Sequence, residues 1–138
     1  RFDFLNESKY VALTNQFLME LVARIVIGIV GALHLYFLWL EMFVWTTKAR
    51  KVFTNFSPDL FEKTKTMAAN QGLYNGFLAA GLVWSLVIEN PLWWVNVAWF
   101  FLGCVAVAGI FGATTIGKKV FFVQALPAII GIILLFFI

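Results

Sequence analysis

Four long runs of apolar residues make up most of this chain, and they constrain its fold more than any other feature. They extend over residues 19–45, 67–88, 92–115 and 120–138, and each is long enough to cross a membrane as a helix, which takes about 20 residues. Charged residues are 12% of the chain, whereas soluble proteins carry about 25%. The sequence therefore predicts an all-α fold: a polytopic membrane protein built as an antiparallel bundle of four transmembrane helices.

The links between these runs are short, which favours antiparallel neighbours. Glu89-Asn90-Pro91 forms a tight corner, and Gly117-Lys118-Lys119 joins the last two runs. The longer segment 46–66 contains Ser57-Pro58, a pair typical of a helix start, so we expect a short interfacial helix that begins at Pro58.

The distribution of Lys and Arg predicts the orientation of the bundle. One side carries Lys48, Arg50, Lys51, Lys63, Lys65, Lys118 and Lys119, and the other carries Arg1, Lys9 and Arg24. By the positive-inside rule the first set is cytoplasmic and both termini face outward. Because topology explains these basic residues, the expected partner is the lipid bilayer, and no nucleic-acid partner is expected.

Residues 1–18 form an N-terminal extension ahead of the transmembrane domain, which we expect over residues 19–138. The extension lacks the order of a basic segment followed by an apolar one that a signal peptide shows. An arm on the outer surface, a processed remnant and a sequence added for expression all remain open.

Polar residues interrupt the apolar runs near the predicted cytoplasmic side. An ionisable side chain in the middle of a bilayer costs about 2.5–3.5 kcal/mol and usually faces a protein interior. His34 and Glu41 lie in the first run, seven residues apart, and Gln124 lies in the fourth. The second run contributes Asn70, Gln71, Tyr74 and Asn75. We expect these residues to converge in the inner half of the bilayer.

Helical spacing supports this convergence. His34, Leu38 and Glu41 share one face of the first helix. Gln71, Tyr74, Asn75 and Leu78 form a comparable stripe on the second. We therefore predict a hydrogen-bonded cluster that joins Glu41 and His34 to Asn70, Gln71 or Asn75, with Gln124 contributing from the fourth helix.

Small residues and tryptophans complete the pattern. Small residues spaced for close helix packing are Gly72 with Gly76, Ala108 with Gly112, and Ala128 with Gly131. Pro127 is expected to loosen the fourth helix because proline lacks an N–H. Trp93, Trp94 and Trp99 suit an aromatic belt at the outer interface, and Trp45 suits the inner one.

Several of these strings resemble a bacterial membrane-protein family, domain of unknown function 1304. The resemblance rests on Leu40-Glu41-Met42-Phe43-Val44-Trp45, on Asn70-Gln71-Gly72-Leu73-Tyr74-Asn75-Gly76 and on Phe122-Val123-Gln124-Ala125-Leu126-Pro127. It covers about residue 19 to the C-terminus and implies a small four-span protein of the bacterial inner membrane. It supplies no activity, catalytic residue or cofactor, and residues 1–18 depart from the usual family beginning.

The predicted cluster favours a polar pocket that binds a small amphipathic or lipid-like molecule, open toward the inner leaflet and closed by an apolar outer half. The candidate ligand-binding residues are His34, Glu41, Asn70, Gln71, Tyr74, Asn75 and Gln124. Two alternatives remain: an accessory subunit of a larger homo- or hetero-oligomeric complex, and a proton-coupled transporter. No metal site is expected, because metal-ligand spacing is absent from the sequence. Catalysis and cofactors are left open.

Overall fold

All regular secondary structure in the described part of the chain is helical, which confirms the predicted all-α fold. The computed structural model describes the backbone of residues 2–138 and the side chains of residues 6–138. In chain order the elements are α1 (Phe2–Met42), α2 (Ala49–Val52), α3 (Pro58–Lys63), α4 (Lys65–Val87), α5 (Pro91–Thr115), α6 (Lys118–Val120), the π-helix η1 (Phe121–Ala125) and α7 (Leu126–Leu135).

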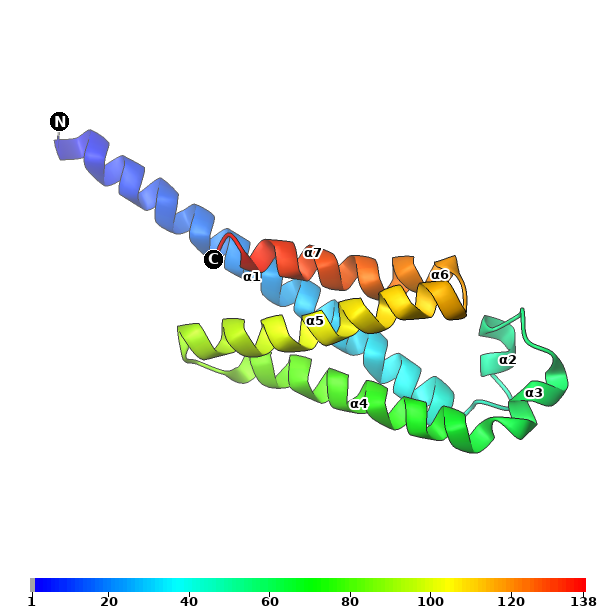
Figure 1. Cartoon of the computed structure of the whole chain (residues 1–138). Helices are drawn as coiled ribbons and strands as arrows, with labels where there is room; N and C mark the ends of the chain where they lie inside the picture. Colours follow the sequence, from blue (N-terminus) through cyan, green and yellow to red (C-terminus); the bar gives the residue numbers. More distant parts are fainter. Residues whose placement is uncertain (1) are drawn as a thin grey trace.

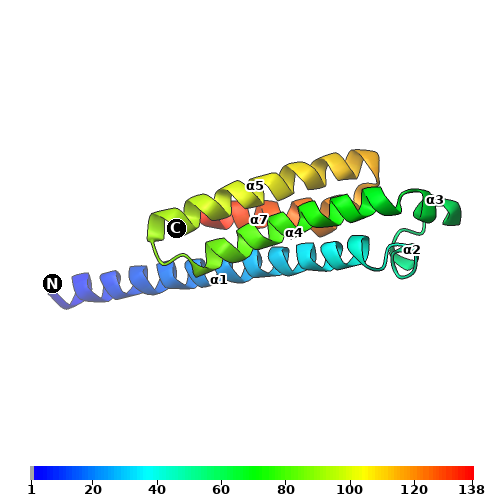
Figure 2. The same ribbon diagram turned by 90° about the horizontal axis from the view of Figure 1, so that it is seen from below.

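Four long helical segments lie alongside one another and run in alternating directions (Figure 1). α4 packs against α1 and α5, and η1 with α7 packs against α5. α7 also contacts α1. Figure 2 shows the bundle from below, with α4 next to α1. The short helices α2, α3 and α6 share one end of the molecule, which we call the basic end because its loops carry most of the lysines.

Residues 2–18 are helical and continue without a break into the first apolar run as part of α1. This N-terminal part of α1 projects beyond the ends of the other helices (Figure 1). The side chains of residues 6–18 are exposed. Arg1 lies outside the described residues.

Within the described residues, three helical segments are long and apolar enough to cross a membrane: Asn6–Met42, Pro91–Thr115 and Lys118–Leu135. α4 spans 23 residues but carries Asn70, Gln71 and Asn75 in its first half, which lowers its hydropathy. Membrane crossing by α4, and with it the four-span bundle, therefore stays a prediction.

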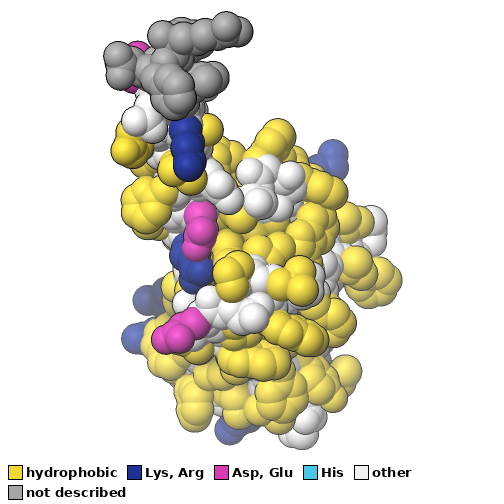
Figure 3. Space-filling model, turned by 90° about the vertical axis from the view of Figure 1, so that its left-hand side faces the viewer, with side chains coloured by type: hydrophobic (Ala, Val, Ile, Leu, Met, Phe, Trp, Pro, Cys, Tyr) yellow, Lys and Arg dark blue, Asp and Glu magenta, His cyan; other side chains and the backbone are white. Residues whose placement is uncertain are grey.

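The surface of the helices is strongly apolar. Phe77 on α4 is 57% exposed, and Phe100 and Phe111 on α5 are 65% and 68% exposed. Hydrophobic side chains cover most of the face shown in Figure 3. Large contiguous apolar surfaces mark interaction with membranes or other proteins. Together with the three apolar segments, this surface is compatible with a membrane protein.

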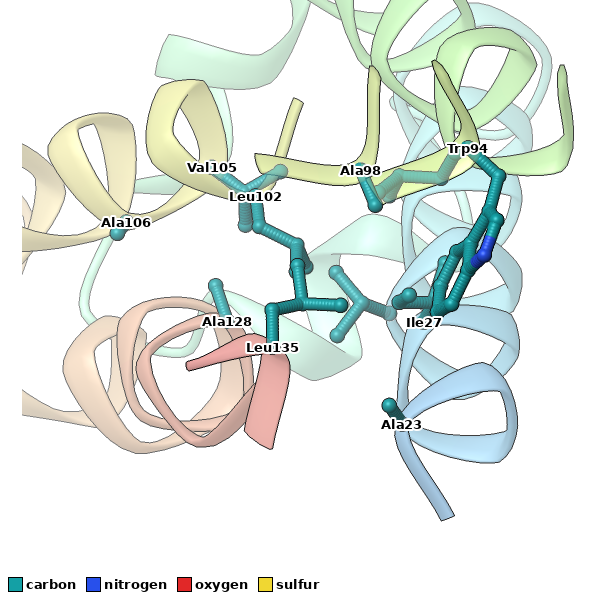
Figure 4. Close-up of a cluster of buried hydrophobic side chains, with 11 residues drawn as sticks. Ala23, Ile27, Trp94, Ala98, Leu102, Val105, Ala106, Ala128 and Leu135 are labelled. Atoms are coloured by element: carbon teal, nitrogen blue, oxygen red, sulfur yellow. The ribbon is translucent and has the colours of Figure 1, made fainter. Parts of the chain in front are cut away.

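The main hydrophobic core lies toward the end opposite the basic end and draws on all four long segments (Figure 4). Its buried members are Ala23, Ile27 and Val30 of α1, Leu82 of α4, Trp94, Ala98, Leu102, Val105 and Ala106 of α5, and Ala128 and Leu135 of α7. This half of the molecule is therefore packed by apolar side chains.

A second, smaller cluster closes the basic end. Leu40, Ala49 and Phe61 are buried there, and Val44, Trp45, Phe53 and Phe56 pack against them. The indole N–H of Trp45 donates a hydrogen bond to Thr64 Oγ1 at 3.1 Å. α3 begins at Pro58 as predicted, after Ser57 in an extended conformation. The segment 46–66 is thus folded onto the end of α1, and Trp45 is part of this aromatic cluster.

Two glycines on α4 permit its close approach to α1. A Cβ added at Gly76 would lie 2.5 Å from Leu38 Cδ1, and one at Gly72 would lie 3.1 Å from the Leu38 carbonyl oxygen. On α5 the close contact is made by Gly109, where a Cβ would lie 2.5 Å from the Ala125 backbone nitrogen. The expected contact residue Ala108 is instead exposed, because it lies one position, or about 100°, around the helix from Gly109.

Candidate functional site

Two side-chain hydrogen bonds between helices form the candidate site. Asn75 Nδ2 on α4 donates to Glu41 Oε2 on α1 at 2.7 Å. Gln124 Nε2 on η1 lies 3.3 Å from His34 Nε2 on α1. We call these the carboxylate pair and the imidazole pair. Both belong to the half of the molecule nearer the basic end, outside the main apolar core.

The carboxylate pair depends on the close packing of α1 and α4. Gly72 and Asn75 are buried on the same face of α4, and a Cβ at Gly72 would come within 3.1 Å of Glu41 Cβ. Glu41 is half-buried and Asn75 is only 6% exposed. The small Gly72 lets the two backbones come close enough for the short side chain of Asn75 to reach the carboxylate.

The hydrogen bonds of His34 define its tautomer. The ring is fully buried, and Nδ1 lies 2.8 Å from the carbonyl oxygen of Val30. A carbonyl only accepts, so Nδ1 carries the proton and donates. Nε2 is then the acceptor in the neutral ring, and the Gln124 amide must donate to it. The rings of His34 and Phe37 form a T-shaped contact with a centroid distance of 5.7 Å.

Gln124 reaches His34 from an irregular part of the fourth helical segment. It lies in the five-residue π-helix η1, directly before α7. Pro127 in the first turn of α7 has no N–H to pair with the carbonyl four residues back. A π-helical stretch is one way for a helix to absorb such a disruption, and such stretches are frequent at functional sites. The irregular segment lies where Pro127 is expected to loosen the helix.

The structure leaves three of the predicted residues outside both pairs. Asn70, Gln71 and Tyr74 are exposed, and Asn70 Nδ2 donates to the Thr66 carbonyl of its own helix at 3.2 Å. Tyr74 is rotated by about 100° from Asn75 around α4, and its side chain is exposed. α1 ends at Met42, which lies next to Gly72. Gln71 therefore lies at the end of the contact between α1 and α4.

Comparison with known proteins supports the sequence resemblance. The model of the family described as "Protein of unknown function (DUF1304)" matches residues 28–136. This chain belongs to that family. It is also 25% identical over 119 residues to the uncharacterised protein YpaA of Lactococcus lactis subsp. lactis (strain IL1403), covering 84% of this chain and 98% of that protein. No solved structure matches this chain.

Both hydrogen-bonded pairs lie inside the segment that defines the DUF1304 family, because His34, Glu41, Asn75 and Gln124 all fall within residues 28–136. Every buried side-chain nitrogen and oxygen in the described part of this DUF1304 protein has a hydrogen-bond partner. Among residues 6–138, no three His, Cys, Asp or Glu side chains gather in a way that could hold a metal ion. The fully buried polar atoms at the site therefore all have hydrogen-bond partners within the protein.

Two surface hollows lie away from these pairs. A shallow groove of about 680 Å³ runs along α5 and is lined by Trp99, Phe100, Gly103, Cys104, Val107, Ala108 and Phe111. Another, of about 520 Å³, borders Glu7 and Val11 on α1. Neither touches the carboxylate pair or the imidazole pair. A pocket at those residues stays a prediction.

Arg24, which in the sequence indicates only topology, forms a third polar contact between helices. Its guanidinium donates to the Leu86 carbonyl at 3.1 Å and to Glu20 at 2.9 Å, and lies 4.1 Å from the centre of the Trp94 ring. Trp94 is buried beneath it, unlike the exposed Trp93. In the sequence, the spacing of Glu20 and Arg24, four residues apart on one helix, could have predicted their ion pair. The contacts with Leu86 and Trp94 depend on packing between helices.

Proposed function

We propose that this protein is a four-span protein of the bacterial inner membrane, with α4 as the additional span. α4 is 23 residues long, or about 34 Å, which is enough to cross the hydrocarbon layer. It packs between α1 and α5. Asn75 on α4 pairs with Glu41 instead of facing lipid. This hydrogen bond lowers the free-energy cost of placing the moderately polar helix α4 in a bilayer.

The proposed orientation places the basic end in the cytoplasm. The alternating directions of the long segments bring α2, α3 and α6 to one end (Figure 1). Lys48, Arg50, Lys51, Lys63, Lys65, Lys118 and Lys119 lie in or beside these short helices. The positive-inside rule then places both termini outside. In this orientation the carboxylate and imidazole pairs occupy the inner half of the bilayer.

The proposed activity of this site is the binding of a small amphipathic molecule through its polar end. The observation that carries this proposal is the half-buried Glu41, whose carboxylate is held by Asn75 at 2.7 Å between two helices. A carboxylate has about four acceptor positions, so a single hydrogen bond leaves capacity for a ligand. Ionisable residues within spans usually mark functional sites.

Native mass spectrometry of the protein released from mild detergent tests this proposal. A small molecule that co-purifies with the wild type and is lost in Glu41→Gln supports it. Glu62→Gln is the matched control, because Glu62 is an exposed carboxylate paired with Arg50 in the loop. Absence of any bound small molecule from the wild type would contradict ligand binding.

A second candidate is an accessory subunit of a larger complex, and the groove on α5 favours it. A Cβ added to Gly103 would meet nothing within 4 Å, whereas one at Gly112 of the same helix would lie 2.8 Å from Val120 Cγ1. Small residues that open onto a helix surface suit the docking of another helix in a membrane. A stable complex with a second protein in the same experiment would support this role.

Proton-coupled transport by His34 and Glu41 is the third candidate. It would require polar groups to continue through the half of the bundle opposite the basic end. The core there is built from apolar residues such as Ile27, Leu82 and Leu102. Proton flux through reconstituted vesicles that is lost on substitution of His34 would favour transport over binding.

A further inference from the structure

The hydrogen bonds inside the candidate site use the N–H donors of its side chains and leave side-chain oxygen acceptors without a partner. An ionised carboxylate has no N–H or O–H, so Asn75 must be the donor in the 2.7 Å contact with Glu41 Oε2. No other hydrogen bond of Glu41 is present among the described residues, and the side chain is half-buried. Its second oxygen, Oε1, is therefore an acceptor without a partner in the protein.

The imidazole pair, in a different part of the site, also uses its N–H donors and leaves an oxygen acceptor unpaired. Because His34 Nδ1 donates to the Val30 carbonyl at 2.8 Å, its Nε2 accepts, and Gln124 must donate through its amide nitrogen. The carbonyl oxygen of the Gln124 side chain has no partner among the described residues, and this side chain is also half-buried. The His34 ring itself has no remaining donor.

We propose that the amphipathic molecule bound at Glu41 carries a primary ammonium group on an apolar chain. This inference rests on the proposed function and names the ligand class for the same site. An ammonium supplies N–H donors and a positive charge, and both complement Glu41 Oε1. A phosphate or carboxylate head group carries acceptor oxygens and a negative charge, and both would repel the carboxylate oxygen of Glu41. Such a head group is therefore excluded from this position.

The charges near the site are consistent with this selectivity. The four apolar runs contain two carboxylates, Glu20 and Glu41, and Glu20 is paired with Arg24 at 2.9 Å. Arg50, the guanidinium nearest to it in sequence, binds Glu62 at 3.0 Å, and the Lys48 ammonium lies over the Trp39 ring at 4.8 Å from its centre. No described residue forms a salt bridge with Glu41. The Glu41 carboxyl group is thus without a cationic partner among the described residues.

Binding of dodecylamine to the full chain in phosphatidylcholine nanodiscs tests this proposal. Dodecyltrimethylammonium has the same charge and chain but no N–H, and dodecanoate has the opposite charge. We expect saturable binding of dodecylamine, at least tenfold weaker binding of dodecyltrimethylammonium, and no competition by dodecanoate. Glu41→Gln should weaken dodecylamine binding at least tenfold, while Glu62→Gln should leave it unchanged.

The outcomes separate this inference from the function on which it rests. Glu41-dependent binding of dodecanoate would overturn the ammonium class and leave ligand binding intact. Dodecylamine binding that is equal in the wild type and Glu41→Gln, or absent from both, would also overturn it. Size-exclusion chromatography checks folding. If Glu41→Gln does not fold, Glu41→Asp keeps the charge but shortens the side chain, and unchanged binding by that variant would contradict a direct contact.

Discussion

Asn75 is the residue on which the polar contact between α1 and α4 depends. It is almost fully buried, and it gives Glu41 its single hydrogen bond among the described residues. Side-chain hydrogen bonds within membranes contribute about 0.6 kcal/mol on average and rarely exceed about 1.7 kcal/mol. The carboxylate pair therefore contributes modestly to stability, which is consistent with a site that a ligand completes.

Replacing Asn75 with leucine should lower the free energy of unfolding by about 1 kcal/mol, because the hydrogen bond is lost and Glu41 remains without a partner. Asn70→Leu is the matched control, since Asn70 is exposed and bonds only to its own helix; it should change stability by less than about 0.5 kcal/mol. Unfolding in mixed micelles measures both variants. Equal effects would contradict a specific role for Asn75.

Arg24 provides a second prediction for a single residue. Arg24→Gln should destabilise the protein by about 2 kcal/mol, because it removes a charged hydrogen bond to Leu86 and the stacking on Trp94. It should also alter tryptophan fluorescence. Arg50→Gln is the control: Arg50 forms an exposed pair with Glu62, which is worth less than about 1 kcal/mol. A larger loss in Arg50→Gln would contradict this ranking.

Among the helical elements, the contact between α1 and α4 is set by two glycines. The Leu38 side chain fills the space above Gly76, so an added methyl group would have to displace that side chain. The same contact aligns Glu41 with Asn75. Small residues at such crossings allow close backbone packing in membranes, where the hydrophobic effect does not drive helices together.

Gly76→Ala should therefore destabilise the protein by about 1–3 kcal/mol through overpacking against Leu38. The double variant with Leu38→Ala should recover part of this loss, because the space is restored. Gly103→Ala is the control, since a Cβ there meets nothing within 4 Å. Thermal unfolding in detergent compares the three variants. A neutral Gly76→Ala would show that α4 does not pack this closely.

The sequence predicted the elements better than their contacts. Apolar runs and the Asn90-Pro91 corner locate the helices, because length and helix-start signals are local properties. Helical spacing also placed Glu41 and Asn75 on facing surfaces. It assigned Tyr74 to the same stripe, and Ala108 to the contact made by Gly109, because a shift of one position rotates a side chain by about 100°. The stacking of Arg24 on Trp94 arises only when α1 and α5 meet.

In the proposed topology, a four-span bundle holds the polar pairs in the inner half of the membrane. Three apolar segments and an apolar surface are compatible with membrane insertion. The position of α4 between α1 and α5 gives its polar face a partner inside the protein. In this proposed topology, Glu41 lies in the inner half of the bilayer.

Labelling of single cysteines in intact cells with a membrane-impermeant reagent tests the proposed topology. In a Cys104→Ser background, which removes the one natural cysteine, Glu89→Cys should react from outside. Lys63→Cys and Lys118→Cys should react only after the membrane is opened, because both lie at the basic end. Reaction of either lysine position from outside, or protection of Glu89→Cys, would contradict the proposed topology and the inner position of the site.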